Sequence, residues 1–168
     1  LHVKLLVHLG MQLLLVATQH LGCGLHQRIE CGGIERFRVL LVTPHRPGTD
    51  LTFSMPKSWS LLALVGGDKR ILDAYRASVV DTLAWAEARL AHTRVIEKGK
   101  ETLIPTGNLV IALFQHDTNR NQEPNAHFHA VIANLTQGPD GKWRALRNDR
   151  LWAMNTLLNS MTMTHFRG

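Results

Sequence analysis

A long run of helical periodicity stands in the middle of this 168-residue chain and limits the folds that are open to it. Asp68 is a typical helix N-cap, and we expect a helix that begins there and continues to about His92. Its apolar residues recur every three or four positions, as in a helix that buries one face: Leu72, Tyr75, Val79, Leu83, Ala86 and Leu90. The pattern therefore predicts one long amphipathic helix packed against a core.

Strands are predicted on both sides of this helix. Asp50–Ser54 alternates polar and apolar residues as a half-buried strand does, and Pro56 ends it because proline cannot donate to a ladder. Two further strands, Leu109–Phe114 and His127–Leu135, are separated by a polar loop over Asp117–Ala126. The remaining predicted elements are a short helix over residues 57–65, a strand over Lys142–Leu146, and a final helix from Arg150 to about Thr164 capped by Asn148 or Asp149.

The composition is that of a globular chain, with 45% apolar and 19% charged residues, and it argues against a disordered or collagen-like protein. The net charge of +6 is spread along the chain and favours nucleic acid or another polyanion as partner without identifying either. The apolar run Leu13–Ala17 is too short to span a bilayer, and no targeting segment is expected. Cys23 and Cys31 fit neither a disulfide framework nor a zinc half-site, which predicts free thiols in a reducing compartment.

Three of the ten histidines have a spacing with chemical content. His127 and His129 are two residues apart in a predicted strand, so they project from the same face at a separation of about 6–7 Å. His116 falls at the end of the preceding strand and can lie beside the pair if the two strands are antiparallel. Three neutral imidazoles could hold a cation with positions open for water or substrate. Accidental proximity is the competing interpretation, and the spacing alone does not select a reaction.

Long motifs around these histidines resemble a known family. They are HRPGTDLTFSMPKSWSLLALVGGDKR (45–70), TGNLVIALFQHDTNRNQEPNAHFHAVIAN (106–134) and DGKWRALRND (140–149). In this order they closely resemble the relaxase domain of TraI/TrwC-type (MobF) conjugative relaxases. The resemblance runs almost without gaps from His45 to about Asp149.

The resemblance implies an α+β fold, an antiparallel β-sheet with helices packed on one face, which is the palm-like fold of relaxases and HUH endonucleases. Such relaxases nick one DNA strand at a plasmid origin of transfer, and a tyrosine near the N-terminus attacks the scissile phosphate. By motif position, His116, His127 and His129 would hold a divalent metal, Mg²⁺ or Mn²⁺, that polarises this phosphate. Asp50 matches the family aspartate that orients or deprotonates catalytic groups.

The same resemblance implies the partners and the location. The expected partner is single-stranded plasmid origin-of-transfer DNA, with relaxosome and type IV coupling proteins added in full-length relatives. A bacterial cytoplasmic location without membrane insertion is expected. Four basic residues could contact DNA phosphates, although an ordinary solvated surface explains them equally well: Lys57, Arg144, Arg147 and Arg150.

The chain departs from the family pattern where the nucleophile is expected. Residues 1–45 contain no tyrosine, and the single tyrosine, Tyr75, lies on the apolar stripe of the long helix, where core packing is expected. Residues 1–33 show no resemblance, so we expect an unassigned N-terminal segment followed by a partial relaxase domain over residues 34–168. No Walker A sequence is present. We therefore expect the metal half of the site without the nucleophile, and no strand cleavage by this chain.

Two other functions stay open at this point. One is a non-catalytic single-stranded-DNA-binding remnant that holds no metal. The other is an unrelated three-histidine metalloenzyme acting on small molecules, which the flanking motifs disfavour. Trp59 and Phe128 could stack on DNA bases, although such residues more often fill a core.

Overall fold

The computed structural model describes residues 4–5 and 47–168. The expectations for Cys23, Cys31 and the boundary after residue 33 lie outside the described residues. The strands are β1 (Lys4–Leu5), β2 (Gly48–Ser54), β3 (His92–Glu97), β4 (Lys100–Pro105), β5 (Val110–Thr118), β6 (Pro124–Ala133), β7 (Thr136–Gln137) and β8 (Trp143–Arg144). The helices are α2 (Lys57–Leu64), α3 (Lys69–Leu90), α4 (Asp149–Ala153) and α5 (Asn155–Arg167). Among the described residues, no helix combines the length and apolar character needed to cross a membrane.

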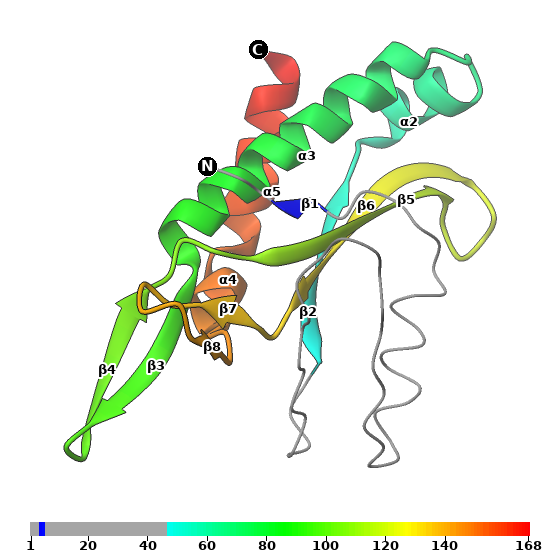
Figure 1. Ribbon diagram of the computed structural model, residues 1–168. Helices are drawn as coiled ribbons and strands as arrows, with labels where there is room; N and C mark the ends of the chain where they lie inside the picture. The colour runs from blue at the N-terminus through cyan, green and yellow to red at the C-terminus, as the bar shows by residue number, and fades with distance from the viewer. Residues whose placement is uncertain (1–3, 6–46) are drawn as a thin grey trace, which may run out of the picture. The chain divides into compact units, whose positions relative to one another are not determined.

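Four strands form the main sheet in the order β1-β5-β6-β2 (Figure 1). The central strand β6 is antiparallel to both β5 and β2, whereas β1 is parallel to β5. Ala130 of β6 lies between Leu113 of β5 and Leu51 of β2 in the register, and all three side chains are buried. Because strand side chains alternate between faces, this row and every second row beside it belong to one covered face.

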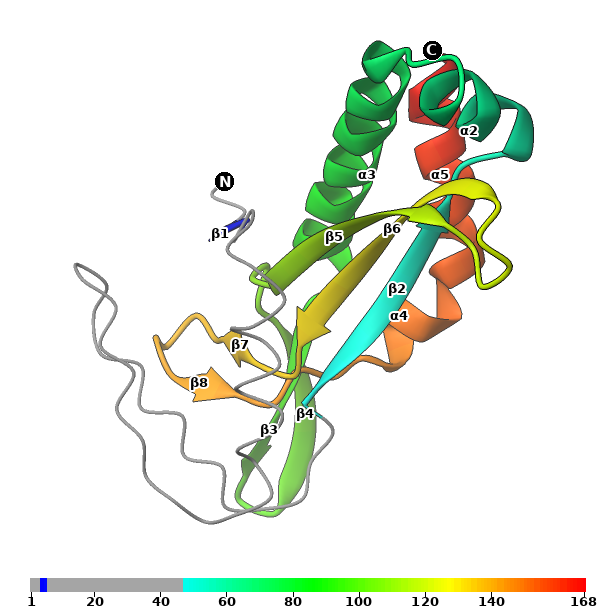
Figure 2. The same ribbon diagram turned by 90° about the vertical axis from the view of Figure 1, so that its right-hand side faces the viewer.

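Helices α3 and α5 cover that face, so the core lies between the sheet and a helical layer (Figure 2). From α3, Val79 and Leu83 are fully buried at the predicted helical spacing. They join a single cluster with Phe53 of β2 and Ile132 of β6. The predicted α+β fold, with helices packed on one face of an antiparallel sheet, is therefore confirmed.

Tyr75 lies inside this core, as its place on the apolar stripe predicted. Its side chain is 1% exposed, and its ring packs 5.3 Å from Phe166 and 5.9 Å from Phe128 between ring centroids. Burial raises the pKa of Tyr75 to about 12. Phe128 is equally buried and fills the core, while Trp59 is partly exposed and meets Phe166 edge-on.

The hairpin formed by β3 and β4 is an element that the sequence analysis missed. Its strands are joined by Lys98 and Gly99, whose φ angles of 49° and 77° both lie in the left-handed region. A two-residue turn with positive φ at both positions suits the twist of paired strands, and glycine adopts it without steric cost. The sequence signal was a Lys-Gly pair between two segments that contain β-branched residues, HTRVIE and KETLIP.

The predicted polar loop over Asp117–Ala126 is too long. β5 continues to Thr118 and β6 begins at Pro124, so both strands extend into the polar segment. The ladder continues past the apolar core because His116 pairs with His127 across the two strands. Hydrogen bonding of the backbone, rather than burial of side chains, defines these strand ends.

The predicted final helix is two helices, α4 and α5, which meet at Met154. Asn148 occupies the N-cap position of α4, yet its side chain makes no cap hydrogen bond. Its amide instead donates to the hydroxyl of Thr49 on β2 at 2.7 Å. A contact between distant elements therefore replaces the expected local one.

The start of α3 agrees with its prediction, whereas the strand predicted over Lys142–Leu146 does not reach its full length. Asp68 caps α3 as expected, since its carboxylate accepts the backbone N–H of Arg70. The predicted strand over Lys142–Leu146 is shorter, because only β8 pairs with β7, and Leu146 forms an isolated bridge to Thr93.

The layered core leads to a stability prediction. Leu83→Ala should lower the free energy of unfolding by about 2–5 kcal/mol, because Leu83 is fully buried between helix and sheet. Leu62→Ala on α2 is the matched control, since that side chain is 55% exposed and its loss should change the free energy by less than about 0.5 kcal/mol. Urea denaturation followed by circular dichroism measures both. Equal losses in the two variants would contradict this description of the core.

Candidate metal centre

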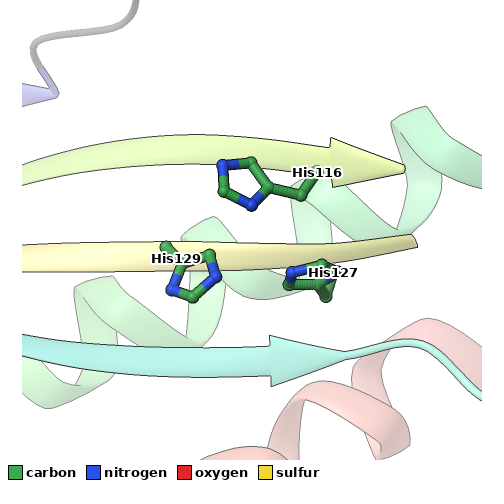
Figure 3. A group of neighbouring side chains, drawn as sticks. All are labelled: His116, His127 and His129. Atoms are coloured by element: carbon green, nitrogen blue, oxygen red, sulfur yellow. The ribbon is translucent and has the colours of Figure 1, made fainter. Parts of the chain in front are cut away.

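The register of β5 and β6 brings the three predicted histidines together on the face of the sheet opposite the helices. His116 pairs directly with His127, and Phe114 pairs with His129 two rows away, which is the next row on the same face. His127 and His129 alternate with Phe128, which is buried, so both imidazoles point away from the core (Figure 3). The expectation that His116 lies beside the pair is met, but it lies within β5 rather than at its end.

The three rings form a compact triangle. Their centroids are 5.2 Å apart for His116 and His127, 4.8 Å for His116 and His129, and 5.1 Å for His127 and His129. One ring nitrogen from each histidine can be chosen so that all three lie within 4.8 Å of one another. His116 is exposed and the other two are half-buried, so the triangle is reachable from solvent.

Hydrogen bonds orient two of the three rings. Nδ1 of His127 lies 2.9 Å from the carbonyl oxygen of Asn125, which can only accept, so this nitrogen carries the proton. Nδ1 of His129 lies 2.7 Å from a carboxylate oxygen of Asp50, which accepts in the same way. Both hydrogen bonds leave the lone pair of Nε2 available. This is the usual arrangement around a metal-ligating histidine, whose second nitrogen donates to a carboxylate or carbonyl.

The third histidine is held in its neutral form by its surroundings. Burial lowers the pKa of His116, and the electrostatic influence of the neighbouring His129 and His127 lowers it further. Asp117 and Asp50 act in the opposite direction but do not outweigh these causes. A neutral imidazole offers a lone pair, so the site favours the state of His116 that can bind a cation.

The donor set fits a divalent metal ion. Imidazole nitrogens suit divalent transition ions, and three of them leave further coordination positions open. Asp50 orients His129 from outside the triangle, so the three donors themselves add no charge to that of the ion. The geometry can therefore hold a cation that keeps its full double charge toward a ligand from solution.

Lys57 lies near the histidine end of the sheet. It begins α2, three residues after Ser54, and Ser54 pairs with His127 in the ladder. Its ammonium group lies 3.1 Å from a carboxylate oxygen of Glu123 in the loop that joins β5 and β6. Both side chains are about half exposed, so the contact is open to solvent.

The three predicted arginines lie elsewhere, around β8 and α4, which follow the opposite end of β6 (Figure 1). Arg144 makes two hydrogen bonds to Asp140, at 2.7 and 2.6 Å, and these lower the pKa of the Asp140 carboxyl. Arg147 donates to Asp149 at 2.8 Å. Arg150 lies 2.7 Å from Nε2 of His92. The structure therefore does not gather the arginines with Lys57 around the histidines.

The carbonyl of Asn125 is a part of the site that the sequence analysis missed. Every residue has a backbone carbonyl, so no residue type signals which one will orient a histidine. The link between Lys57 and Glu123 was also missed, because it joins residues far apart in sequence. The register of β2 with β6, which sets the distance between these segments, could not be read from one chain segment alone.

The fold and the histidine triangle define an α+β domain with a candidate metal centre on the open face of its sheet. The chain belongs to the TrwC relaxase family, whose model matches residues 10–168. That match begins ahead of residue 34, where the sequence resemblance placed the start of the relaxase domain. The family predicted from the motifs is therefore confirmed.

Relatives and solved structures agree with this assignment. The chain is 53% identical over 107 residues to the multifunctional conjugation protein TraI of Escherichia coli K12, which covers 64% of this chain and 6% of that protein. It is 47% identical, with a TM-score of 0.71, to the conjugative relaxase TrwC in complex with oriT DNA, in metal-free and metal-bound structures. These cover 73% of this chain and 43% and 42% of theirs. The chain thus spans only a small part of the curated relatives.

The electrostatics of the triangle give a pH prediction. His116 should titrate below its ordinary pKa of 6.5 in the folded chain, as followed by NMR. The folded state then binds this proton more weakly than the unfolded chain does, so the free energy of unfolding should decrease as the pH falls from about 7 to 5. His116→Asn should weaken that decrease. His165→Asn, at the exposed end of α5, is the control, and an ordinary midpoint for His116 would contradict the prediction.

Proposed function

We propose that this chain is part of a conjugative DNA relaxase that binds a divalent cation and single-stranded origin-of-transfer DNA. The observation that carries the proposal is the triangle of His116, His127 and His129 on the open face of the sheet. The TrwC structures in complex with oriT DNA, one of them metal-bound, support both ligands. We place the chain in the bacterial cytoplasm, where relaxosome and coupling proteins would be its further partners.

The cation would polarise a phosphate of the DNA backbone and stabilise the charge that develops on its oxygens. His116, His127 and His129 would supply three neutral nitrogen ligands. Asp50 would hold His129 in the tautomer whose Nε2 faces the ion. Of the two ions expected, we favour Mn²⁺ over Mg²⁺, because imidazole ligands suit transition ions and Mg²⁺ prefers oxygen donors.

We propose that the chain binds DNA without cutting it. A relaxase needs an accessible nucleophile, and the one tyrosine of this sequence, Tyr75, is buried in the core with a raised pKa. Asp50 is committed to His129 and lies on the sheet face opposite Tyr75. The chain therefore has the residues for holding a phosphate but offers no tyrosine to attack it.

Contacts with the DNA backbone are proposed for Lys57 first. Lys57 starts a helix beside the histidine end of the sheet, and its pairing with Glu123 is open to solvent and so readily exchanged for a phosphate. Three arginines are proposed as weaker contacts, because they lie around β8 and α4, away from the histidines: Arg144, Arg147 and Arg150. We also propose that residues 34–168 form the relaxase part of the chain.

The metal site can be tested by calorimetric titration of the full chain with Mn²⁺. We expect the wild type to bind one ion and His127→Ala to bind it about 100-fold more weakly or worse, since changes outside the ligand set alone cost 10–100-fold. His165→Ala removes an exposed histidine from α5 and should bind like the wild type. Equal heats from wild type and His127→Ala would contradict the three-histidine site and favour a DNA-binding remnant without metal.

Strand cleavage is tested with a supercoiled plasmid that carries a family origin of transfer, in the presence of Mn²⁺. We expect binding of the corresponding single strand, with an affinity that falls as salt rises, and no relaxed plasmid. Tyr75→Phe should behave in the same way, because Tyr75 packs in the core. Relaxed product covalently attached to the wild-type chain would show that another residue acts as the nucleophile.

A further inference from the structure

One peptide unit at the start of β6 is held on both sides. Its carbonyl, from Asn125, accepts from Nδ1 of His127 at 2.9 Å. Its N–H, from Ala126, donates to the hydroxyl oxygen of Ser60 on α2 at 3.1 Å. Because a peptide unit is planar, the acceptor for its N–H also fixes the direction of its carbonyl. Ser60 is therefore connected to His127 through a single rigid group.

Ser60 lies where α2, β2 and β6 meet. Its side chain is fully buried, and its hydroxyl donates to the carbonyl of Met55 at 3.4 Å. The backbone N–H of Met55 in turn donates to the carbonyl of Ala126 at 3.0 Å. Both Met55 and Ala126 are buried, so solvent does not readily replace the hydroxyl if it is removed.

We propose that Ser60 is a positioning residue for His127, which it holds in the tautomer protonated at Nδ1. This inference rests on the proposed metal site, to which it adds a residue in the helical layer. With Ser60 in place, the Asn125 carbonyl faces the imidazole and takes the Nδ1 proton, so the lone pair of Nε2 is free for a cation. Ser60 contacts neither the cation site nor the DNA in this proposal.

Loss of the hydroxyl has a defined consequence. In Ser60→Ala, the N–H of Ala126 loses its acceptor in a buried place, and an unsatisfied buried donor drives local rearrangement. The peptide unit then turns or shifts to find another acceptor, and its carbonyl leaves Nδ1 of His127. The imidazole is free to carry its proton on either nitrogen, and molecules protonated at Nε2 cannot bind a cation through that atom.

The control variant must lose a hydroxyl that is as buried as that of Ser60 but lies away from the histidines. Thr82 of α3 provides it, since its side chain is fully buried and its hydroxyl bonds to Ser78 and Thr162 within the helical layer. Thr82→Val keeps the shape of the side chain and removes the hydroxyl. A purely structural role for Ser60 would make the two variants behave alike.

The test measures the ring-nitrogen chemical shifts of His127 by ¹⁵N NMR in the metal-free chain, at a pH where the imidazole is neutral, with assignment by His127→Ala. We expect one Nδ1-protonated tautomer in wild type and Thr82→Val, and a mixture in Ser60→Ala. Mn²⁺ affinity should fall about tenfold in Ser60→Ala only. If Ser60→Ala does not fold, Ser60→Cys keeps a weak acceptor of similar size and should give an intermediate mixture.

The outcomes separate this inference from the proposed function. Unchanged His127 shifts in Ser60→Ala, or in Ser60→Cys where that variant replaces it, would overturn the positioning role. A wild type that binds no Mn²⁺ would overturn the proposed metal site, while the tautomer measurement on the metal-free chain would still decide the role of Ser60.

Discussion

The antiparallel pairing of β5 with β6 is the interaction on which the site and the core both depend. Its register places Leu113 opposite Ala130 on the covered face and His116 opposite His127 on the open face. Side chains alternate along a strand, so a slip of one residue would send Phe128 to solvent and His127 into the core. The free energy of burying Phe128 and Ile132 therefore also stabilises the register that assembles the histidines.

Buried polar side chains add to the effect of the apolar core, because their hydrogen bonds fix where β5 and β6 start. Ser60 holds the first residues of β6, and the carboxylate of Glu87 accepts the backbone N–H of Leu109, just before β5. Glu87 is nearly fully buried, and this burial raises its pKa. Apolar packing excludes a slip of one residue but opposes a slip of two less strongly, because that slip keeps the same face buried, whereas a hydrogen bond to a single N–H specifies one position. The histidine-bearing strands are thus tied to the helical layer by hydrogen bonds to defined atoms.

Much of this arrangement could be predicted from the sequence, because periodicity reports which face is buried. The spacing of Val79 and Leu83 predicted the helix and its covered side, and the two-residue spacing of His127 and His129 predicted their shared face. The meeting of His116 with that pair depended on strands pairing as expected, and the structure bears this out. Local pattern was sufficient wherever the governing interaction lay within one element.

The parts that could not be predicted depend on contacts between distant segments. Asn148 was expected to cap a helix, yet its side chain bonds to Thr49, 99 positions away in the sequence. The ends of β5 and β6 lie beyond the apolar pattern, because backbone pairing continues through polar residues. The carbonyl that orients His127 carries no side-chain signal at all. These features follow from the register of the folded sheet, which one sequence does not display.

The orientation of the proposed metal ligands in this chain does not depend on its tyrosine. The hydrogen bonds that orient His127 and His129 come from Asn125 and Asp50, and both belong to the main sheet. The helical layer that supports the sheet contains Tyr75 as a packing residue, fully withdrawn from the open face. A cation site can therefore keep its geometry whether or not a nucleophile stands beside it, because no ligand, and no hydrogen bond that orients one, depends on a tyrosine.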